Sequence, residues 1–315
     1  MLDSRTSRAA CVARAAGLLT AALALAGCGS SSASSPPKGH GTIAVVAAEN
    51  QYGSVASQVG GRYVTVASVE SDPNTDPHSY EVSASVAQEV SGANVVIQNG
   101  VGYDTFMSNV EAASPNVTRL VVDVQHLLGK ADSTPNPHLW YDPATMPKVA
   151  TALAVDFSSL QPSHAAYFQA MARRFDASLA PWLQAIARFK ATEPAAAVAT
   201  TEPVADYLLT AAGATNLTPL SFQLDVMNGV DPSPQDVSLE SGLLTQHKVE
   251  VLVYNEQVTD SLTESFIASA QGAHIPVVGV YETMPAPGYT YESWMLAEVD
   301  ALQRAVADGT STTHL

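Results

Sequence analysis

The sequence predicts an α/β protein with two lobes, and three observations support this fold class. Short apolar runs alternate with helical patterns up to residue 142, two helical patterns follow one another between residues 147 and 189, and the alternation resumes at residue 195. Alternation of this kind indicates mostly parallel sheets covered by helices on both faces. A chain of 315 residues is long enough for two such domains. We therefore expect two three-layer α/β lobes with helices between them.

The first lobe is expected to span residues 42–142 and to contain four strands. Helical spacing places Tyr52, Val55 and Val59 on one face of its first helix, and the Gly60-Gly61 pair ends that helix. In chain order, the expected strands are Thr42–Ala47, Tyr63–Val69, Ala93–Gln98 and Arg119–Asp123, and the expected helices are Glu49–Gly61, Val82–Ser91 and Tyr103–Val110.

Residues 143–190 are expected to link the lobes through two helices. Pro147–Leu160 forms the first, and Ser163–Phe189 forms the second with Ser163 as its N-cap. Apolar residues recur at every third or fourth position of the second helix, which indicates core packing. At the helical rise this segment would span roughly 40 Å. Pro181 should kink or break it near residue 177.

The second lobe is expected to span residues 191–315. Glu202-Pro203 follows its first strand, and Pro203 suits the first turn of the next helix. The interval Leu217–Asp236 is rich in loop residues. The expected strands are Ala195–Thr200, Val249–Tyr254 and Pro276–Val280, and the expected helices are Val204–Ala212, Gln235–Gln246, Thr259–Gln271 and Tyr291–Ala307.

The amino terminus is predicted to be a targeting segment. A basic stretch precedes the apolar run Ala15–Ala26, which suits a signal peptide of residues 1–27 and is too short to span a bilayer. Leu25-Ala26-Gly27-Cys28 resembles the lipobox of bacterial lipoproteins, so Cys28 is expected to carry lipid. A plain secretory signal with an incidental cysteine is the alternative. Residues 28–41, rich in Ser, Pro and Gly, have the composition of a flexible tether.

The charge of the chain limits its partners. The sequence has 30 acidic and 14 basic residues, a formal net charge of −16. This balance argues against binding to nucleic acid and against docking by charge on anionic lipid. A diffuse acidic surface keeps a protein soluble, and it also suits a protein that collects cations.

Four residues in similar positions are candidate metal ligands. His78 and His138 each follow a proline in a loop, and X-Pro steps such as Asp76-Pro77 stiffen the chain near the first. Glu202 and Glu282 each follow a predicted strand of the second lobe. Any one of these residues alone would most often be an ordinary turn histidine or a solvated carboxylate. Their combination predicts a shared site, because binding residues gather where strands give way to loops.

Several motifs resemble those of the metal-specific solute-binding lipoproteins of zinc and manganese ABC transporters. They are Asp76-Pro77-His78-Ser79-Tyr80-Glu81, Asn99-Gly100-Val101-Gly102-Tyr103, Pro137-His138-Leu139-Trp140, Thr201-Glu202, and Glu282-Thr283 followed by Trp294. The resemblance covers nearly all of the chain from Thr42 onward. It implies two Rossmann-like lobes joined by a long helix, with a metal in the cleft between them held by His78, His138, Glu202 and Glu282.

The sequence departs from this family in ways that leave the metal open. The long histidine-rich loop common in the zinc-importing branch is absent, and the third ligand is Glu202 where that branch often has histidine. Two histidines and two carboxylates accommodate Mn²⁺ and Fe²⁺ as well as Zn²⁺. The fourth ligand is most often aspartate in the family, so either Glu282 or its neighbour Glu256 could fill that position.

The resemblance implies capture and delivery of Zn²⁺ or Mn²⁺, with Fe²⁺ also accommodated. Four protein ligands would leave no open position for catalysis, so no enzyme activity is expected. The implied partners are an ABC permease with its ATPase and, through the lipid anchor, the extracytoplasmic face of the cell membrane. A monomer is expected. The alternatives are a metal-stabilised adhesin or structural lipoprotein, and a metallohydrolase, for which no His-Glu-x-x-His signature is found. His126 is a candidate auxiliary metal contact.

Overall fold

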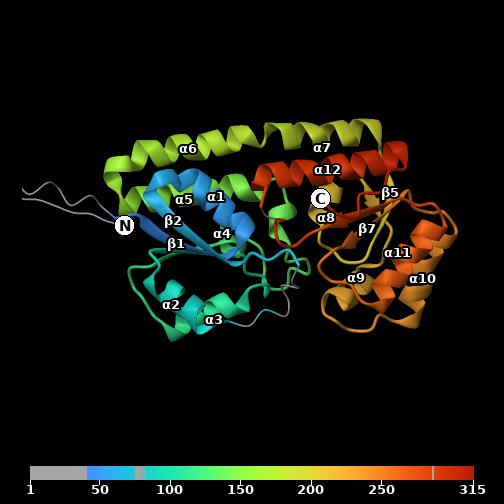
Figure 1. Cartoon of the computed structure of the whole chain (residues 1–315), viewed down its shortest axis with the longest axis horizontal. Helices are drawn as coiled ribbons and strands as arrows, with labels where there is room; N and C mark the ends of the chain where they lie inside the picture. The colour runs from blue at the N-terminus through green and yellow to red at the C-terminus, as the bar shows by residue number, and fades with distance from the viewer. Residues whose placement is uncertain (1–40, 75–79, 81, 286) are drawn as a thin grey trace, which may run out of the picture. The chain divides into compact units, whose positions relative to one another are not determined.

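The computed structural model describes residues 41–74, 80, 82–285 and 287–315, within one compact unit that spans His40–Leu315. The expected signal peptide, Cys28, nearly all of the tether, and His78 lie outside the described residues. The described part contains two four-stranded parallel sheets, each with helices on both faces (Figure 1). The predicted α/β class with two lobes is therefore confirmed.

The first sheet has the strand order β2-β1-β3-β4. Alternate residues of β1 face opposite layers: Val45 and Ala47 pack with α1 and α5, whereas Val46 and Ala48 pack with α2 and α3. Burial on both faces explains why these strands are continuous apolar runs. The elements are β1 (Ile43–Glu49), α1 (Asn50–Gly60), β2 (Val64–Glu70), α2 (Ala84–Gly92), β3 (Val95–Gln98), α3 (Thr105–Ala113), β4 (Leu120–Asp123), α4 (Val124–Leu128) and α5 (Thr145–Leu160).

The second sheet has the strand order β6-β5-β7-β8. Helices α8 and α12 cover one of its faces, and α9, α10 and α11 cover the other. The elements are β5 (Ala197–Thr200), α8 (Asp206–Ala212), β6 (Thr215–Asn216), α9 (Leu220–Met227), α10 (Pro234–Thr245), β7 (Val251–Asn255), α11 (Ser261–Gly272), β8 (Val277–Val280) and α12 (Tyr291–Asp308).

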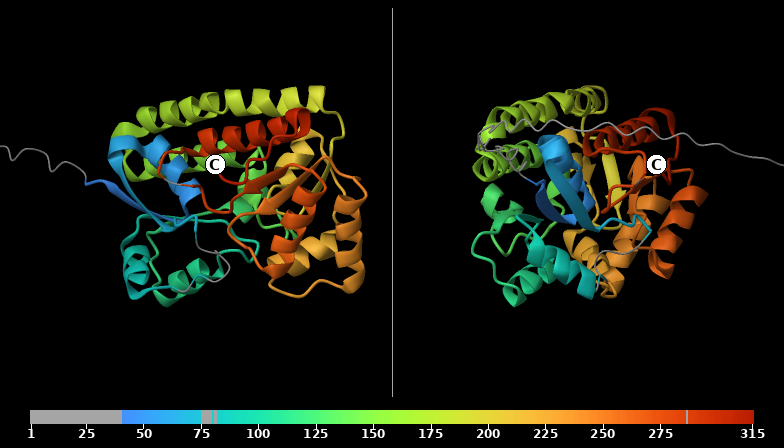
Figure 2. Two further views of the ribbon diagram at one scale, coloured as in Figure 1. Left: turned by 45° about the vertical axis from the view of Figure 1, so that its right-hand side comes forward. Right: turned by 60° about the vertical axis from the view of Figure 1, so that its left-hand side comes forward.

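Two consecutive helices, α6 (Ala165–Ser178) and α7 (Ala180–Thr192), link the lobes. Helix α6 packs on α1 of the first lobe and on α5, the helix expected to begin the linking segment, and α7 packs on α12 and α8 of the second lobe (Figures 1 and 2). The predicted break is confirmed, because regular helix stops after Ser178 and begins again at Ala180. Pro181 has no N–H to donate to the carbonyl of Ala177, four residues earlier, so the helical ladder is interrupted there.

Three local expectations were wrong. Ser163 is not an N-cap, because it lies inside the short 3-10 helix Pro162–His164 that precedes α6. Pro203 does not open a helix, because α8 begins only at Asp206. The loop-rich interval from Leu217 holds α9, whose Phe222 and Val226 are buried in the core of the second lobe. A short helix such as α9 is stabilised by tertiary packing, which local propensity does not predict.

One hydrophobic core cluster contains residues of both lobes, of the linking helices and of α12. Trp182 of α7 and Phe175 of α6 both pack near Tyr291, the first residue of α12. The lobes are thus joined by packed side chains in addition to the chain connection. Across the described residues, no helix combines the length and the apolar character needed to cross a membrane.

Candidate metal centre

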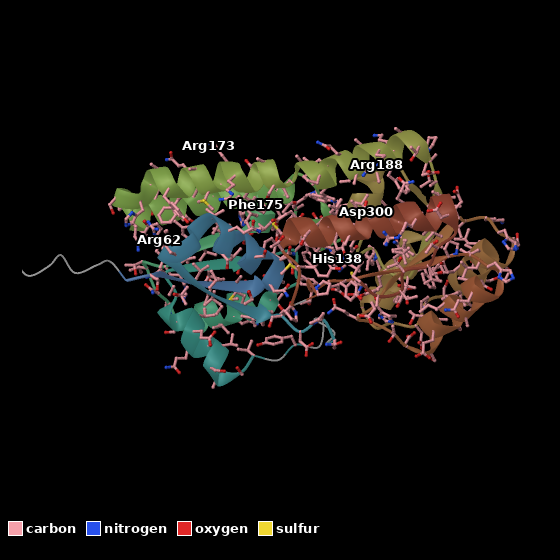
Figure 3. All side chains as sticks on the ribbon, turned by 45° about the horizontal axis from the view of Figure 1, so that its top comes forward. Arg62, His138, Arg173, Phe175, Arg188 and Asp300 are labelled. Carbon is pink, nitrogen blue, oxygen red and sulfur yellow. The ribbon has the colours of Figure 1, made fainter. Side chains whose placement is uncertain are left out.

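The strand order of the second sheet brings its candidate residues together. Strands β5, β7 and β8 are neighbours in that order and run parallel. Their carboxyl ends therefore lie side by side, with Glu202 just after β5, Asn255 at the end of β7 and Glu282 just after β8. Parallel sheets place ligand sites at this edge. Figure 3 shows His138 between the two lobes.

Glu282 is fully buried and is contacted from both lobes. Its Oε2 lies 3.2 Å from His138 Nε2 and accepts a hydrogen bond of 2.8 Å from the Tyr103 hydroxyl. Its Oε1 accepts a hydrogen bond of 2.6 Å from Asn255 Nδ2. The same amide donates to Oε1 of Glu202 at 3.2 Å. The two glutamates of the second lobe are thereby joined through one side chain.

His138 is held with Nε2 facing Glu282. Asn136 Oδ1 accepts from the backbone N–H of His138 at 2.9 Å and lies 2.8 Å from its Nδ1. The amide orientation of Asn136 is fixed by this backbone donor and by the bond from its Nδ2 to the carbonyl of Pro203. Nδ1 therefore carries a proton, which leaves the lone pair of Nε2 available to bind a metal.

Amide side chains also hold the backbone around Glu282. Gln257 Oε1 accepts from the N–H groups of Glu282 and Thr283, both at 2.7 Å. Asn50, at the start of α1, exchanges two hydrogen bonds of 2.9 Å with the backbone of Met284. Gln51 donates to the carbonyl of Glu282. Asn50 and Gln51 of the first lobe thus hold in place the second-lobe loop that carries Glu282.

The first lobe adds buried acidic groups beside this region. Burial raises the pKa of Glu49 well above its usual value, and the nearby carboxyls of Asp104 and Glu70 raise it further. Burial also raises the pKa of Asp104 to about 6, although backbone N–H groups of Gly100 and Asn99 oppose the shift. Burial first, and then the charge of Glu282, raise the pKa of the Tyr103 hydroxyl. A raised pKa means that a carboxyl carries less charge than an exposed one would, and a cation bound nearby would oppose these shifts.

The structure brings together some of the predicted ligands. His138 and Glu282 are in contact, and Glu202 reaches them through Asn255. Glu256, the alternative to Glu282, instead pairs with His314 at 2.9 Å near the surface. His126 is 88% exposed beside Asp123. His78 lies outside the described residues, and within the described ranges no group of three His, Cys, Asp or Glu side chains could by itself hold a metal ion.

Sequence reasoning missed the amides that organise the site. Asn136 precedes the Pro137-His138 motif, and Asn255 precedes Glu256 at the end of a buried strand. The position of Asn255 could have been noted, since a polar residue at the end of such a strand often faces a site; Asn136 lies in a loop, where this signal does not apply. Asparagine is also a common turn residue, so these positions carry no distinctive signal by themselves.

Comparisons with known proteins concern the family and the fold of this chain. The family model described as "ZnuA: Zinc-uptake complex component A periplasmic" matches residues 45–305. The manganese-binding lipoprotein MntA of Bacillus subtilis (strain 168) is 26% identical over 170 residues, which are 52% of this chain and 55% of that relative. The chain thus spans about half the length of that curated relative.

Solved structures share the fold. The periplasmic zinc binding protein TroA from Treponema pallidum aligns with a TM-score of 0.73 at 18% identity, covering 85% of this chain and 100% of that one. A mutant of the laminin-binding adhesin (Lmb) from Streptococcus agalactiae aligns with a TM-score of 0.70 at 16% identity, covering 84% and 99%. At identities of 16% and 18%, the similarity to these structures shows a shared fold and no more.

Proposed function

Because this chain belongs to the ZnuA family of periplasmic zinc-uptake components, we propose that it captures Zn²⁺ or Mn²⁺ and delivers the ion to an ABC importer. The observation that carries this proposal is the contact between His138 of the first lobe and Glu282 of the second, with 3.2 Å between Nε2 and Oε2. A nitrogen and a carboxylate oxygen in this position suit a divalent transition metal.

The proposed ligands are His78 and His138 from the first lobe, residues 42–142, and Glu202 and Glu282 from the second, residues 191–315. Two carboxylates neutralise a dication, so the ion can be buried without uncompensated charge. A shell closed by four protein ligands leaves no position for substrate, so the proposed role is transport and not catalysis. Release follows when the lobes separate, because each lobe then keeps only half of the ligands.

The proposal includes the membrane anchor. Lipid on Cys28 and the tether of residues 28–41 would hold the lobes at the extracytoplasmic face, where the permease and its ATPase receive the ion. Changing Cys28→Ala is expected to release the protein from the membrane fraction while metal binding in solution is retained. Protein that stays in the membrane fraction after this change would contradict the anchor.

Metal uptake in cells tests the proposed function. A strain without its own copy of the protein would carry the wild type, His138→Ala or His126→Ala, and uptake of radioactive zinc and manganese would be measured under metal limitation. His126 is a matched control, because it is an exposed histidine of the same lobe. We expect uptake to be lost with His138→Ala and retained with His126→Ala. Equal uptake by all three strains would overturn the proposal.

Adhesion is the second candidate function, favoured by the fold shared with the laminin-binding adhesin. The same strains can be tested for binding to immobilised laminin. Loss of adhesion in the His138→Ala strain with unchanged metal uptake would support adhesion. Loss of uptake with unchanged adhesion would support capture and delivery.

A further inference from the structure

One amide side chain occupies the space between the two carboxylates of the second lobe. Asn255 Nδ2 donates to Glu282 Oε1 at 2.6 Å and to Glu202 Oε1 at 3.2 Å. Asn255 is 1% exposed, so water does not compete for these bonds. A primary amide has two N–H groups, and both are directed at carboxylates here.

The orientation of this amide is fixed by its other contacts. Asn255 Oδ1 accepts a hydrogen bond of 3.1 Å from the backbone N–H of Gln257, and a backbone N–H can only donate. Its own backbone N–H donates to Thr201 Oγ1 at 3.0 Å. The amide therefore cannot exchange its nitrogen and oxygen without losing the bond from Gln257. The N–H groups are held toward Glu202 and Glu282.

We propose that Asn255 determines how many oxygen atoms the two carboxylates offer to a bound metal. Because Asn255 holds one oxygen of each glutamate, each glutamate binds the ion through its other oxygen only. Glu282 fits this arrangement, since Oε2 is the oxygen that faces His138 Nε2. Oε2 also accepts a hydrogen bond from the Tyr103 hydroxyl, but that O–H can rotate away from an incoming ion, whereas the amide of Asn255 is fixed by Gln257. This inference rests on the proposed function and makes Asn255 a residue that determines metal specificity.

A site in which each carboxylate contributes only one oxygen atom to the ion favours the binding of zinc over that of manganese. Zn²⁺ is satisfied by four ligands, whereas Mn²⁺ prefers about six, largely oxygen atoms. A glutamate that bound Mn²⁺ through both oxygens would give up its hydrogen bond from Asn255. A hydrogen bond to a charged acceptor contributes enough free energy for a roughly tenfold change in affinity. The amide therefore weakens manganese binding and leaves zinc binding unaffected.

A crystal structure of the zinc-loaded wild-type protein is the direct test and requires no variant. We expect Oε1 of Glu202 and of Glu282 to remain bonded to Asn255 Nδ2 and to lie outside the coordination shell of zinc. Zinc bound through both oxygens of either glutamate would overturn the inference.

The second test compares the zinc and manganese affinities of Asn255→Leu, measured by competition with a chelator. Leucine keeps a similar volume and removes both donors. We expect manganese binding to strengthen relative to zinc by about tenfold or more, because at least one carboxylate is freed to bind through two oxygens. Asn216→Leu is the matched control, because Asn216 lies in the same lobe and its amide donates to Thr200 and Asp206. Its affinity ratio should equal that of the wild type.

The outcomes separate this inference from the proposed function. A wild-type protein that binds neither metal overturns both. Binding by the wild type, with an unchanged ratio of affinities in Asn255→Leu, overturns the role of Asn255 and leaves metal capture standing. If circular dichroism shows that Asn255→Leu does not fold, the zinc-loaded wild-type structure decides the question.

Discussion

The orientation of the His138 ring is set by hydrogen bonds to Asn136. The side-chain oxygen Oδ1 of Asn136 accepts from both the backbone and the ring of His138, while its Nδ2 donates to the carbonyl of Pro203 in the other lobe at 2.7 Å. A buried histidine ligand needs such an acceptor, which selects the tautomer and fixes the ring. Asn136 therefore connects His138 of the first lobe with the backbone beside Glu202 of the second.

Replacing Asn136 by alanine should weaken zinc binding by about 10- to 100-fold, the usual effect of losing the hydrogen-bond partner of a metal-binding histidine. Asn136→Asp keeps an acceptor for Nδ1 and removes the donor to Pro203, so it should recover part of the affinity. Nitrogen NMR of the imidazole ring should show Nδ1 protonated in the wild type and in Asn136→Asp. Wild-type affinity in Asn136→Ala, or an Nδ1 that carries no proton in the metal-free wild type, would refute this role.

At the scale of elements, the carboxyl-terminal segment supports the strand that leads to Glu282. Thr312 pairs with β8 through hydrogen bonds to Val277 and Gly279, and the N–H of Leu315 donates to the Tyr281 hydroxyl. The segment approaches so closely that a Cβ on Gly279 would lie 2.2 Å from the carbonyl oxygen of Thr313. Only glycine leaves room for that backbone contact.

Gly279→Ala should therefore destabilise the protein by about 1–3 kcal/mol, the usual range for overpacking. Gly272→Ala is the control, because a Cβ at Gly272 meets nothing within 4 Å. Urea unfolding of both variants would measure the free energies of unfolding. If Gly279→Ala were as stable as the control, the carboxyl-terminal segment would be able to move aside without loss of stability, and the close backbone contact would not require glycine.

The sequence predicted those elements whose pattern is local. Strands such as β1 and β7 are buried on both faces and appear as apolar runs, and Pro181 marks the break between α6 and α7 because proline removes a hydrogen-bond donor. The two-residue strand β6 was not predicted, since it exists only through its pairing with β5. Its sequence carries no pattern of its own.

In the candidate site, too, some residues are marked by a local sequence pattern, whereas others can be recognised only from the fold. His138 and Glu282 stand out as residue types in motifs that resemble a known family. Their contact results from the way two separate lobes meet, which no local pattern contains. Asn136 and Asn255 matter through hydrogen bonds to residues far along the chain or in another strand, so their roles could be recognised only from the fold.

At the scale of the whole molecule, buried acids should make stability depend on pH. Burial raises the pKa of Glu298 to about 8, although hydrogen bonds from Tyr141 and Trp294 oppose the shift, and burial raises the pKa of Glu240 to about 7. These groups bind a proton more tightly in the folded state than in the unfolded state. Their stabilising contribution is complete below the unfolded pKa, near 4.5, and is lost as the pH rises through the folded values.

The metal-free protein should therefore lose stability between about pH 5 and pH 8, by up to about 1.4 kcal/mol per pH unit for each such group. Glu298→Gln removes one titrating group and should make this dependence less steep. Urea unfolding at several pH values would measure both proteins. Stability that rises between pH 5 and pH 8, or the same slope in Glu298→Gln, would contradict these assignments.

Metal stoichiometry tests the central claim, namely that residues of both lobes bind one ion. The stripped protein would be incubated with zinc or manganese, passed through a gel-filtration column and analysed for bound metal. We predict one equivalent for the wild type, loss of that equivalent in His138→Ala and in Glu282→Gln, and its retention in Glu256→Gln, whose side chain pairs with His314. A wild type without stoichiometric metal, or a Glu282→Gln protein that keeps it, would contradict the account.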